Sequence, residues 1–271
     1  MNYLNNKLGI FSWFGFVMPL PQRLELIKKA GFDATTIWWE DEIGSPWIRK
    51  EDMPGIVRES GLMLENIHVP YADIDDLWSE SKNLRDKIVK RHTAWLNDCA
   101  ELDIPVMLMH IIDRKFPPNP NKWGIESISR LLKIAEDLKL KIALENTGSV
   151  DYIDFVLREL VSDHLVFCYD SSHDFIYSTE KAAILKKQGL RLEHLHLSDN
   201  DLEKDRHWLP GEGIIDWQQI NKTFPRDTYK GNITLEVYPG EDDLKGSPAK
   251  FIEKACQSAI WARKILTVSQ L

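Results

Sequence analysis

The chain has 271 residues, of which 43% are hydrophobic and 28% charged, which is typical of a globular protein with one large domain or two small ones. Its net charge of −8 and its pI of about 5.5 argue against a general attraction to nucleic acid or to an anionic membrane. The cysteines at positions 99, 168 and 256 are odd in number and lack CxxC spacing, which argues against a disulfide framework and a thiolate metal site.

Nothing in the sequence predicts attachment to a membrane. No apolar run reaches the length needed to cross a bilayer. The N-terminal segment MNYLNNKLGIFSWF lacks the basic start and long apolar core of a signal peptide. We therefore expect a cytoplasmic protein with no membrane partner, and the unpaired cysteines fit such a reducing compartment. The sequence leaves open whether the chain forms a homo-oligomer.

Short apolar runs alternate with amphipathic stretches along the whole chain. The predicted strands are Lys7–Trp13, Phe32–Trp39, Leu64–His68, Pro105–His110, Lys141–Glu145, Leu165–Asp170, Leu192–Leu197 and Asn232–Val237. The predicted helices are Pro19–Ala30, Glu51–Ser60, Ser81–Leu102, Ile125–Leu138, Val150–Leu160, Lys181–Gln188, Trp217–Asn221 and Ala249–Leu266. This alternation of eight strand–helix pairs predicts an α/β fold, a (β/α)8 TIM barrel that forms a single domain over residues 1–271. A doubly wound sheet would alternate in the same way, but no GxGxxG or P-loop motif supports it.

Imidazole and carboxylate side chains follow the ends of many of these strands. They are His68, His110, Glu145, Asp170, His173, His196, Asp205, His207 and Glu236. In a barrel the carboxyl ends of all strands meet on one rim, so one pocket would gather these side chains. So many carboxylates in one pocket are costly unless a cation or protons neutralise them. Oxygen and imidazole donors without cysteine suit Mn²⁺, Mg²⁺, Co²⁺ or Zn²⁺, and we predict a divalent metal site.

Each of these residues also has a structural explanation. A single acidic residue at a strand end is commonly solvated or salt-bridged. Metal binding is predicted instead by four of these residues taken together, because all lie at or near the ends of strands in one eight-fold alternation. They are Glu145, Asp170, His196 and Glu236. For His68 and His110, direct substrate contact and support of the metal ligands both stay open. Other histidines do not end a strand and are expected to be structural: His92, His164 and His194.

Aromatic residues lie beside the same predicted rim. Trp13 and Trp38 end the first and second strands, where their rings could cover the apolar face of a sugar or simply pack the barrel. Arg206 or Lys204 could contact an anionic group of a substrate, or could be solvated loop residues. Specificity in barrels is set by loops, here Phe14–Leu20, Glu40–Ile48, Lys115–Trp123 and Leu202–His207.

Five motifs carry a resemblance to a known family. They are LEN at Leu144–Asn146, YDSSH at Tyr169–His173, HLHLSDN at His194–Asn200, DRHWLPGEG at Asp205–Gly213 and LEVYP at Leu235–Pro239. In order and spacing the chain resembles, over essentially its whole length, the xylose isomerase-like TIM barrel superfamily. That superfamily includes sugar phosphate isomerases and epimerases, inosose dehydratase-type enzymes and endonuclease IV.

The resemblance implies one divalent metal held by four side chains, Glu145, Asp170, His196 and Glu236. It implies a metal-dependent isomerase or epimerase that acts on a small sugar or polyol derivative through proton transfer and an enediolate. Glu145 and Glu236 would move the proton. The residues expected to contact the substrate are His68, His110, His173, Trp13, Trp38 and Arg206.

Other activities stay open. The same metal chemistry could serve an inosose dehydratase-type lyase. The similarity to endonuclease IV implies a multi-zinc phosphodiesterase acting on DNA, with up to three metals. The additional ligands would then be His68, His110, His173, Asp205 and His207. The segments after Asn146 and His173 differ from that branch, and together with the negative charge they favour a sugar over a nucleic acid. The non-enzyme alternative is a sugar-binding protein on the same barrel.

Overall fold

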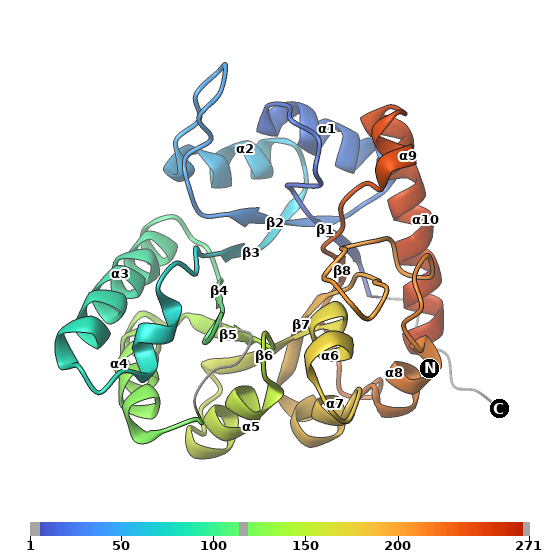
Figure 1. Cartoon of the computed structure of the whole chain (residues 1–271). Helices are drawn as coiled ribbons and strands as arrows, with labels where there is room; N and C mark the ends of the chain where they lie inside the picture. Colours follow the sequence, from blue (N-terminus) through green and yellow to red (C-terminus); the bar gives the residue numbers. More distant parts are fainter. Residues whose placement is uncertain (1–5, 114–118, 268–271) are drawn as a thin grey trace.

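Eight short apolar segments pair as parallel strands in the computed structural model, which describes residues 6–113 and 119–267 (Figure 1). The strands are β1 (Leu8–Phe11), β2 (Ala34–Trp38), β3 (Met63–His68), β4 (Val106–Met109), β5 (Lys141–Glu145), β6 (Leu165–Asp170), β7 (Leu192–His196) and β8 (Ile233–Leu235). Their order is β7-β6-β5-β4-β3-β2-β1-β8. The sheet closes because the Leu197 amide donates to the Thr234 carbonyl at 2.9 Å and the Glu236 amide donates to the Leu197 carbonyl at 3.2 Å. The predicted (β/α)8 barrel is confirmed. The prediction of a single domain covers residues 1–271 and so includes stretches outside the described residues.

Helices surround the barrel (Figure 1). They are α1 (Leu20–Ala30), α2 (Met53–Glu59), α3 (Lys82–Glu101), α4 (Lys122–Leu138), α5 (Val150–Glu159), α6 (Ser171–Tyr177), α7 (Ala183–Gln188), α8 (Trp217–Thr223), α9 (Glu241–Leu244) and α10 (Pro248–Thr267). Short 3₁₀ helices lie at Lys50–Asp52, Ile74–Trp78 and Gly189–Arg191. All the helices predicted from the sequence are present. The prediction did not include α6 and α9.

The start of α4 shows how a side chain sets a helix boundary. Asn121 accepts hydrogen bonds from the amides of Trp123 at 2.9 Å and Gly124 at 3.3 Å, so α4 begins before the predicted Ile125. The predicted loop Lys115–Trp123 therefore ends inside a helix. Its first residues lie in the stretch 114–118, outside the described residues.

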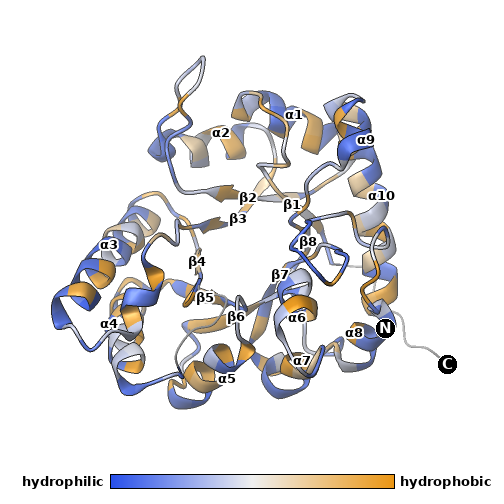
Figure 2. Cartoon of the chain, in the orientation of Figure 1, coloured by the Kyte–Doolittle hydropathy of each residue, from blue (hydrophilic) through white to orange (hydrophobic). Residues whose placement is uncertain are grey.

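Two apolar clusters stabilise the barrel. The larger one lies between the sheet and the helices, and Figure 2 shows both hydrophilic and hydrophobic residues on the surrounding helices, as expected for amphipathic helices. A separate small cluster comes from β4, β5 and β6 and contains Val106, Leu108, Ala143, Val166 and Cys168. These residues precede the strand-end residues by two or four positions, so they face the interior of the barrel. They form an apolar floor below one side of the rim.

The other side of the interior is polar. Glu65 on β3 lies 3.1 Å from His194 Nδ1 and accepts a hydrogen bond of 2.7 Å from the Thr234 hydroxyl. A Cβ at Gly9 would come within 2.4 Å of Thr234 Oγ1, so only glycine fits there. His194 and His196 are two residues apart on β7, so both side chains face the interior of the barrel, and His194 has the structural role expected for it as a partner of Glu65.

Two expectations about the chain as a whole can be compared with the structure. In residues 6–113 and 119–267, none of the helices has the length and apolar character required to cross a bilayer. Cys99, Cys168 and Cys256 are all free and buried, in agreement with the absence of a disulfide framework.

Candidate metal centre and active site

Four buried side chains converge at the carboxyl end of the barrel. Glu145 ends β5, Asp170 ends β6, His196 ends β7, and Glu236 directly follows β8. One oxygen or nitrogen of each residue lies within 4.8 Å of those of the other three. The structure therefore brings together the four residues whose joint register predicted a metal site.

The polar atoms of this cluster are not satisfied by the protein. Among the described residues, no hydrogen-bond partner exists for buried Glu145 Oε1, Asp170 Oδ2 or either ring nitrogen of His196. His196 Nδ1 lies 2.9 Å from Glu236 Oε2, but the two groups are not aligned for a hydrogen bond. Leaving one buried polar atom unpaired costs about 1–3 kcal/mol. Three carboxylates and one imidazole with free donor atoms at one point fit a divalent cation.

Local sequence explains how Asp170 and Glu145 are held. Asp170 ends β6 and also caps α6, since its Oδ1 accepts a 2.6 Å hydrogen bond from the His173 amide and leaves Oδ2 free. Asn146 follows Glu145 and pairs twice with Asp170. Its Nδ2 donates to the Asp170 carbonyl and its Oδ1 accepts from the Asp170 amide, both at 2.8 Å. These bonds fix the ends of β5 and β6 relative to each other.

The charges of the cluster are strongly coupled. Burial, with a further contribution from Glu145, raises the pKa of Asp170 to about 7 although His173 opposes this. Burial disfavours a charged His196, but the carboxylates of Glu145 and Glu236 outweigh it and raise the pKa of His196 well above its ordinary value. Burial likewise opposes ionisation of Glu236, but His196 holds its pKa at about 2. Without a cation, a proton on His196 and partial protonation of Asp170 offset part of the negative charge, while Glu145 and Glu236 stay ionised.

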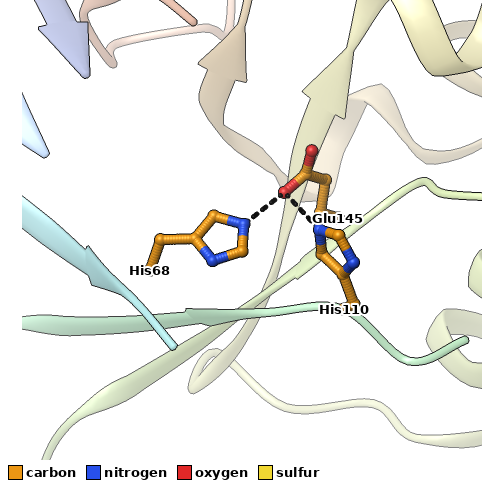
Figure 3. A group of neighbouring side chains, drawn as sticks. All are labelled: His68, His110 and Glu145. Atoms are coloured by element: carbon orange, nitrogen blue, oxygen red, sulfur yellow. Dashed lines mark hydrogen bonds and ion pairs between the residues drawn. The ribbon is translucent and has the colours of Figure 1, made fainter. Parts of the chain in front are cut away.

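Two histidines approach Glu145, one from the end of β3 and one from the segment after β4 (Figure 3). His68 Nε2, at the end of β3, lies 3.2 Å from Glu145 Oε2, and His110 Nε2, after β4, lies 3.5 Å from the same oxygen. His110 is stacked on Tyr71 with ring centroids 4.3 Å apart. Together His68, His110 and Glu145 form a second buried group of donor atoms within 4.8 Å of one another. The geometry thus leaves both roles predicted for these histidines open.

A third group forms around Asp205 in the loop between β7 and α8. Its Oδ2 lies 3.0 Å from both His173 Nε2 and His207 Nε2, and its Oδ1 accepts a 2.6 Å hydrogen bond from the Ser172 hydroxyl. His207 is fixed on its other side, because its Nδ1 lies 3.0 Å from the Glu236 carbonyl. Burial lowers the pKa of His207, whereas the hydrogen bond to Asp205 raises it. Together with the nearby carboxylates, Asp205 has the larger effect, and the pKa is raised to about 9. The loop side chains therefore form an ordered polar wall beside Glu236.

Asp199 organises this loop, and sequence reasoning missed it. Its carboxylate is fully buried and accepts four hydrogen bonds of 2.8–3.0 Å from N–H groups. The donors are the amides of Asn200, Gly211 and Ile215 and the indole of Trp217. A Cβ at position 213 would lie 2.3 Å from Asp199 Oδ1, which explains the last glycine of the PGEG turn. No feature of the sequence separates Asp199 from the other acidic residues of this loop, because its burial and its four partners depend on the fold.

A cavity of about 760 Å³ opens above the cluster. Glu145 and Glu236 line it, as do the residues of the second and third groups and Trp13, Trp38, Tyr71 and Tyr238. Asp170 and His196 are not among the lining residues and lie beneath it. Arg206 does not line it either, because its guanidinium bonds to Asp201 at 2.7–2.8 Å. Tyr71 and Tyr238 were not predicted, although each follows a strand end and Tyr238 lies within the motif LEVYP.

Comparison with known proteins places this site in context. A family model described as xylose isomerase-like TIM barrel matches residues 24–255. Fructoselysine 3-epimerase from Escherichia coli O157:H7 is 22% identical over 251 residues, which cover 85% of this chain and 90% of the relative. Inosose dehydratase from Clostridium perfringens (strain 13 / Type A) is 26% identical over 300 residues, which cover 93% of this chain and 95% of the relative.

Solved structures share the fold at low sequence identity. D-psicose 3-epimerase with D-tagatose, from Clostridium cellulolyticum H10, has a TM-score of 0.77 at 18% identity and covers 97% of this chain and 100% of its own. The IolI protein with a binding zinc atom has a TM-score of 0.74 at 16% identity and covers 96% of this chain and 98% of its own. At such identities the likeness shows a common barrel, and the chemistry of the site must be argued from its own residues.

Proposed function

Because the chain belongs to the xylose isomerase-like TIM barrel family, we propose that it is a divalent-metal-dependent epimerase or isomerase of a small sugar or polyol derivative. Relatives of this chain include sugar epimerases and inosose dehydratases. The proposal goes beyond those names, since it assigns metal dependence and a proton-transfer role to particular residues of this chain.

The division of the four ligand residues supports this proposal best. Glu145 and Glu236 line the cavity, whereas Asp170 and His196 do not. Residues that only hold a cation can lie beneath the cavity, but residues that exchange a proton with substrate must face it. The two cavity-facing members are both carboxylates, which can accept and return a proton.

The charge state of these carboxylates suits a base. Burial opposes ionisation, yet His196 and the neighbouring histidines hold the pKa of Glu145 well below its ordinary value, and His196 holds the pKa of Glu236 at about 2. Both side chains are thus ionised at neutral pH. They come from β5 and from the end of β8, with β6 and β7 between them, so they approach the cavity from different strands. The ionised carboxylate that acts as base removes a proton from carbon and thereby becomes an acid. In an isomerisation it returns that proton to the neighbouring carbon. In an epimerisation the opposite carboxylate first takes up a proton from solvent and delivers it to the other face of the same carbon, while the base releases its proton to solvent.

Other residues of the cavity have supporting roles in this proposal. A divalent cation held by the four ligand residues would stabilise the negative charge that develops on substrate oxygens when the proton leaves carbon. Asp205, which His173 and His207 hold in place, lines the cavity and accepts a hydrogen bond from a substrate hydroxyl. Trp13 and Trp38 provide apolar walls for the ring.

A dehydratase is the second candidate, because an inosose dehydratase covers nearly the whole chain at 26% identity. The first step, proton removal beside a carbonyl, is common to both activities. The products differ, since a dehydratase releases water and forms an unsaturated ketone. NMR spectra of the products in D₂O distinguish epimers from dehydrated species.

The experiment incubates metal-reconstituted protein with a panel of ketoses and inososes in D₂O and measures deuterium incorporation at carbon. Glu145→Gln and Glu236→Gln are each expected to reduce exchange by at least 100-fold, in line with general-base catalysis. Glu203→Gln is the matched control, because Glu203 is exposed on the loop after β7, at the same end of the barrel, and does not line the cavity. Metal content per chain is measured for every variant, so that loss of the base is separated from loss of the cation. Undiminished exchange in both variants would show that the proposal is wrong.

A further inference from the structure

The cavity extends beyond the groups that would handle a sugar ring. Its volume of about 760 Å³ lies in the upper part of the ~300–1,000 Å³ range of pockets that bury drug-sized ligands. A single six-carbon sugar would leave much of this volume empty. Residues 17–19 after β1 and residues 40–46 after β2 also line the cavity. We call the space between these two loops the outer compartment.

Arg23 on α1 ties the two loops of the outer compartment together. Its side chain is only 2% exposed, and its guanidinium donates to the backbone carbonyls of Ser12 and Met18 and to the Glu42 carboxylate. Backbone hydrogen bonds of 2.9 and 3.1 Å between Glu42 and Ile48 close the base of the second loop, which projects from the rim near α2 (Figure 1). Hydrogen bonds within the protein therefore hold both loops of the outer compartment in place.

The outer compartment has both charged and apolar lining. Its carboxylates already have protein partners: Glu42 pairs with Arg23, Glu40 accepts a 2.6 Å hydrogen bond from the Trp38 indole, and Asp41 accepts one of 2.9 Å from the Lys50 amide. Its aliphatic side chains face solvent, since Val17 is 93% exposed and Ile43 is 95% exposed, and Met18 and Pro46 line the same space. These aliphatic side chains offer no hydrogen bonds to the hydroxyl groups of a second sugar. Arg23 already bonds to three oxygen acceptors, so its charge is not free to bind a phosphate or carboxylate.

We infer that the substrate is a sugar that carries an apolar alkyl or aryl substituent, and that the outer compartment binds this substituent. The inference rests on the proposed function, which places the sugar ring beside Glu145 and Glu236. Continuity of one cavity from these carboxylates to Val17 and Ile43 connects the reacting group to the substituent. Free monosaccharides are then poorer ligands than their glycosides or other conjugates.

The test compares two non-reacting probes, methyl β-D-glucoside and n-hexyl β-D-glucoside, by calorimetric titration of the metal-reconstituted protein. Burial of each methylene strengthens binding roughly threefold to fourfold, so coverage of two of the additional methylenes gives about a tenfold preference for the hexyl probe. The Val17→Ser/Ile43→Ser variant is expected to lose this preference. A matched control is Val161→Ser/Leu190→Ser, which changes two residues that are each 86% exposed and do not line the cavity. The control is expected to keep the preference.

Several results would overturn the inference. They are equal affinity for the two probes, tighter binding of glucose 6-phosphate than of either, and a hexyl preference that persists in Val17→Ser/Ile43→Ser. A dimer that dissociates in this variant would place a second copy of the chain on the patch and would overturn it too. Failure of deuterium exchange with intact probe preference would refute only the proposed function. Exchange with free ketoses together with equal probe affinities would refute only the outer compartment.

Discussion

Replacement of Asp199 by asparagine tests whether one buried carboxylate holds the active-site loop. The wild-type carboxylate accepts two N–H groups on each oxygen. Asparagine keeps one such oxygen and places an NH₂ group against the other two donors. Each buried donor left unpaired costs about 1–3 kcal/mol, so the expected loss is roughly 4 kcal/mol. At about 2–4 °C per kcal/mol for a chain of this size, the melting temperature should fall by about 10 °C.

Thermal unfolding followed by circular dichroism measures this loss, in the presence of a chelator so that metal binding does not mask it. Asp201→Asn is the control, because Asp201 lies on the same loop but its partners Arg206, Glu203 and Lys204 are solvent-accessible. The control should change the melting temperature little. Since the loop carries Asp205 and His207, Asp199→Asn should also lower deuterium exchange at temperatures where it is folded. A melting temperature within 2 °C of wild type would refute the reasoning.

Three further predictions concern the metal site. Because Asp170 has a pKa raised to about 7 and must lose its proton to act as a ligand, metal affinity should rise as pH increases from 6 to 8, by up to about tenfold per pH unit for each proton displaced. Calorimetry in buffers of different ionisation enthalpy measures the released protons, and a pH-independent affinity would contradict the assignment. Elemental analysis should find about one metal per chain, whereas three zinc ions per chain and cleavage of abasic DNA would favour the endonuclease alternative. Asn146→Ala should weaken metal binding about 10–100-fold, because it removes both bonds to Asp170. An unchanged dissociation constant in a competition titration with a chelating dye would show that those bonds do not position the ligands.

The ends of the strands were predictable because they depend on local pattern. Continuous apolar runs predict buried parallel strands, and the barrel rule then places Glu145, Asp170, His196 and Glu236 on one rim. Placing these four residues on one rim requires no knowledge of side-chain packing. Short strands and helices in strict alternation are compatible with few topologies, so the fold could be predicted from the pattern.

Contacts made across loops could not be predicted in this way. Arg206 was expected to reach the substrate, but in the structure its guanidinium bonds to Asp201 in the same loop. Asp199 looked like one of several acidic residues after β7, and only the fold shows that four N–H groups surround it. Such roles depend on which backbone amides a loop presents, and periodicity does not encode that.

The separation of the four ligand residues into two layers explains how one site can both hold a cation and move a proton. Asp170 and His196 are buried and do not line the cavity. Changes there should therefore act first on cation affinity. Glu236 faces the cavity and lies 2.9 Å from His196, so it belongs to both layers. A carboxylate in that position can change its proton while its neighbours keep the cation in place. Asp170 and His196 thus hold the cation while the two cavity-lining carboxylates, Glu145 and Glu236, exchange the proton.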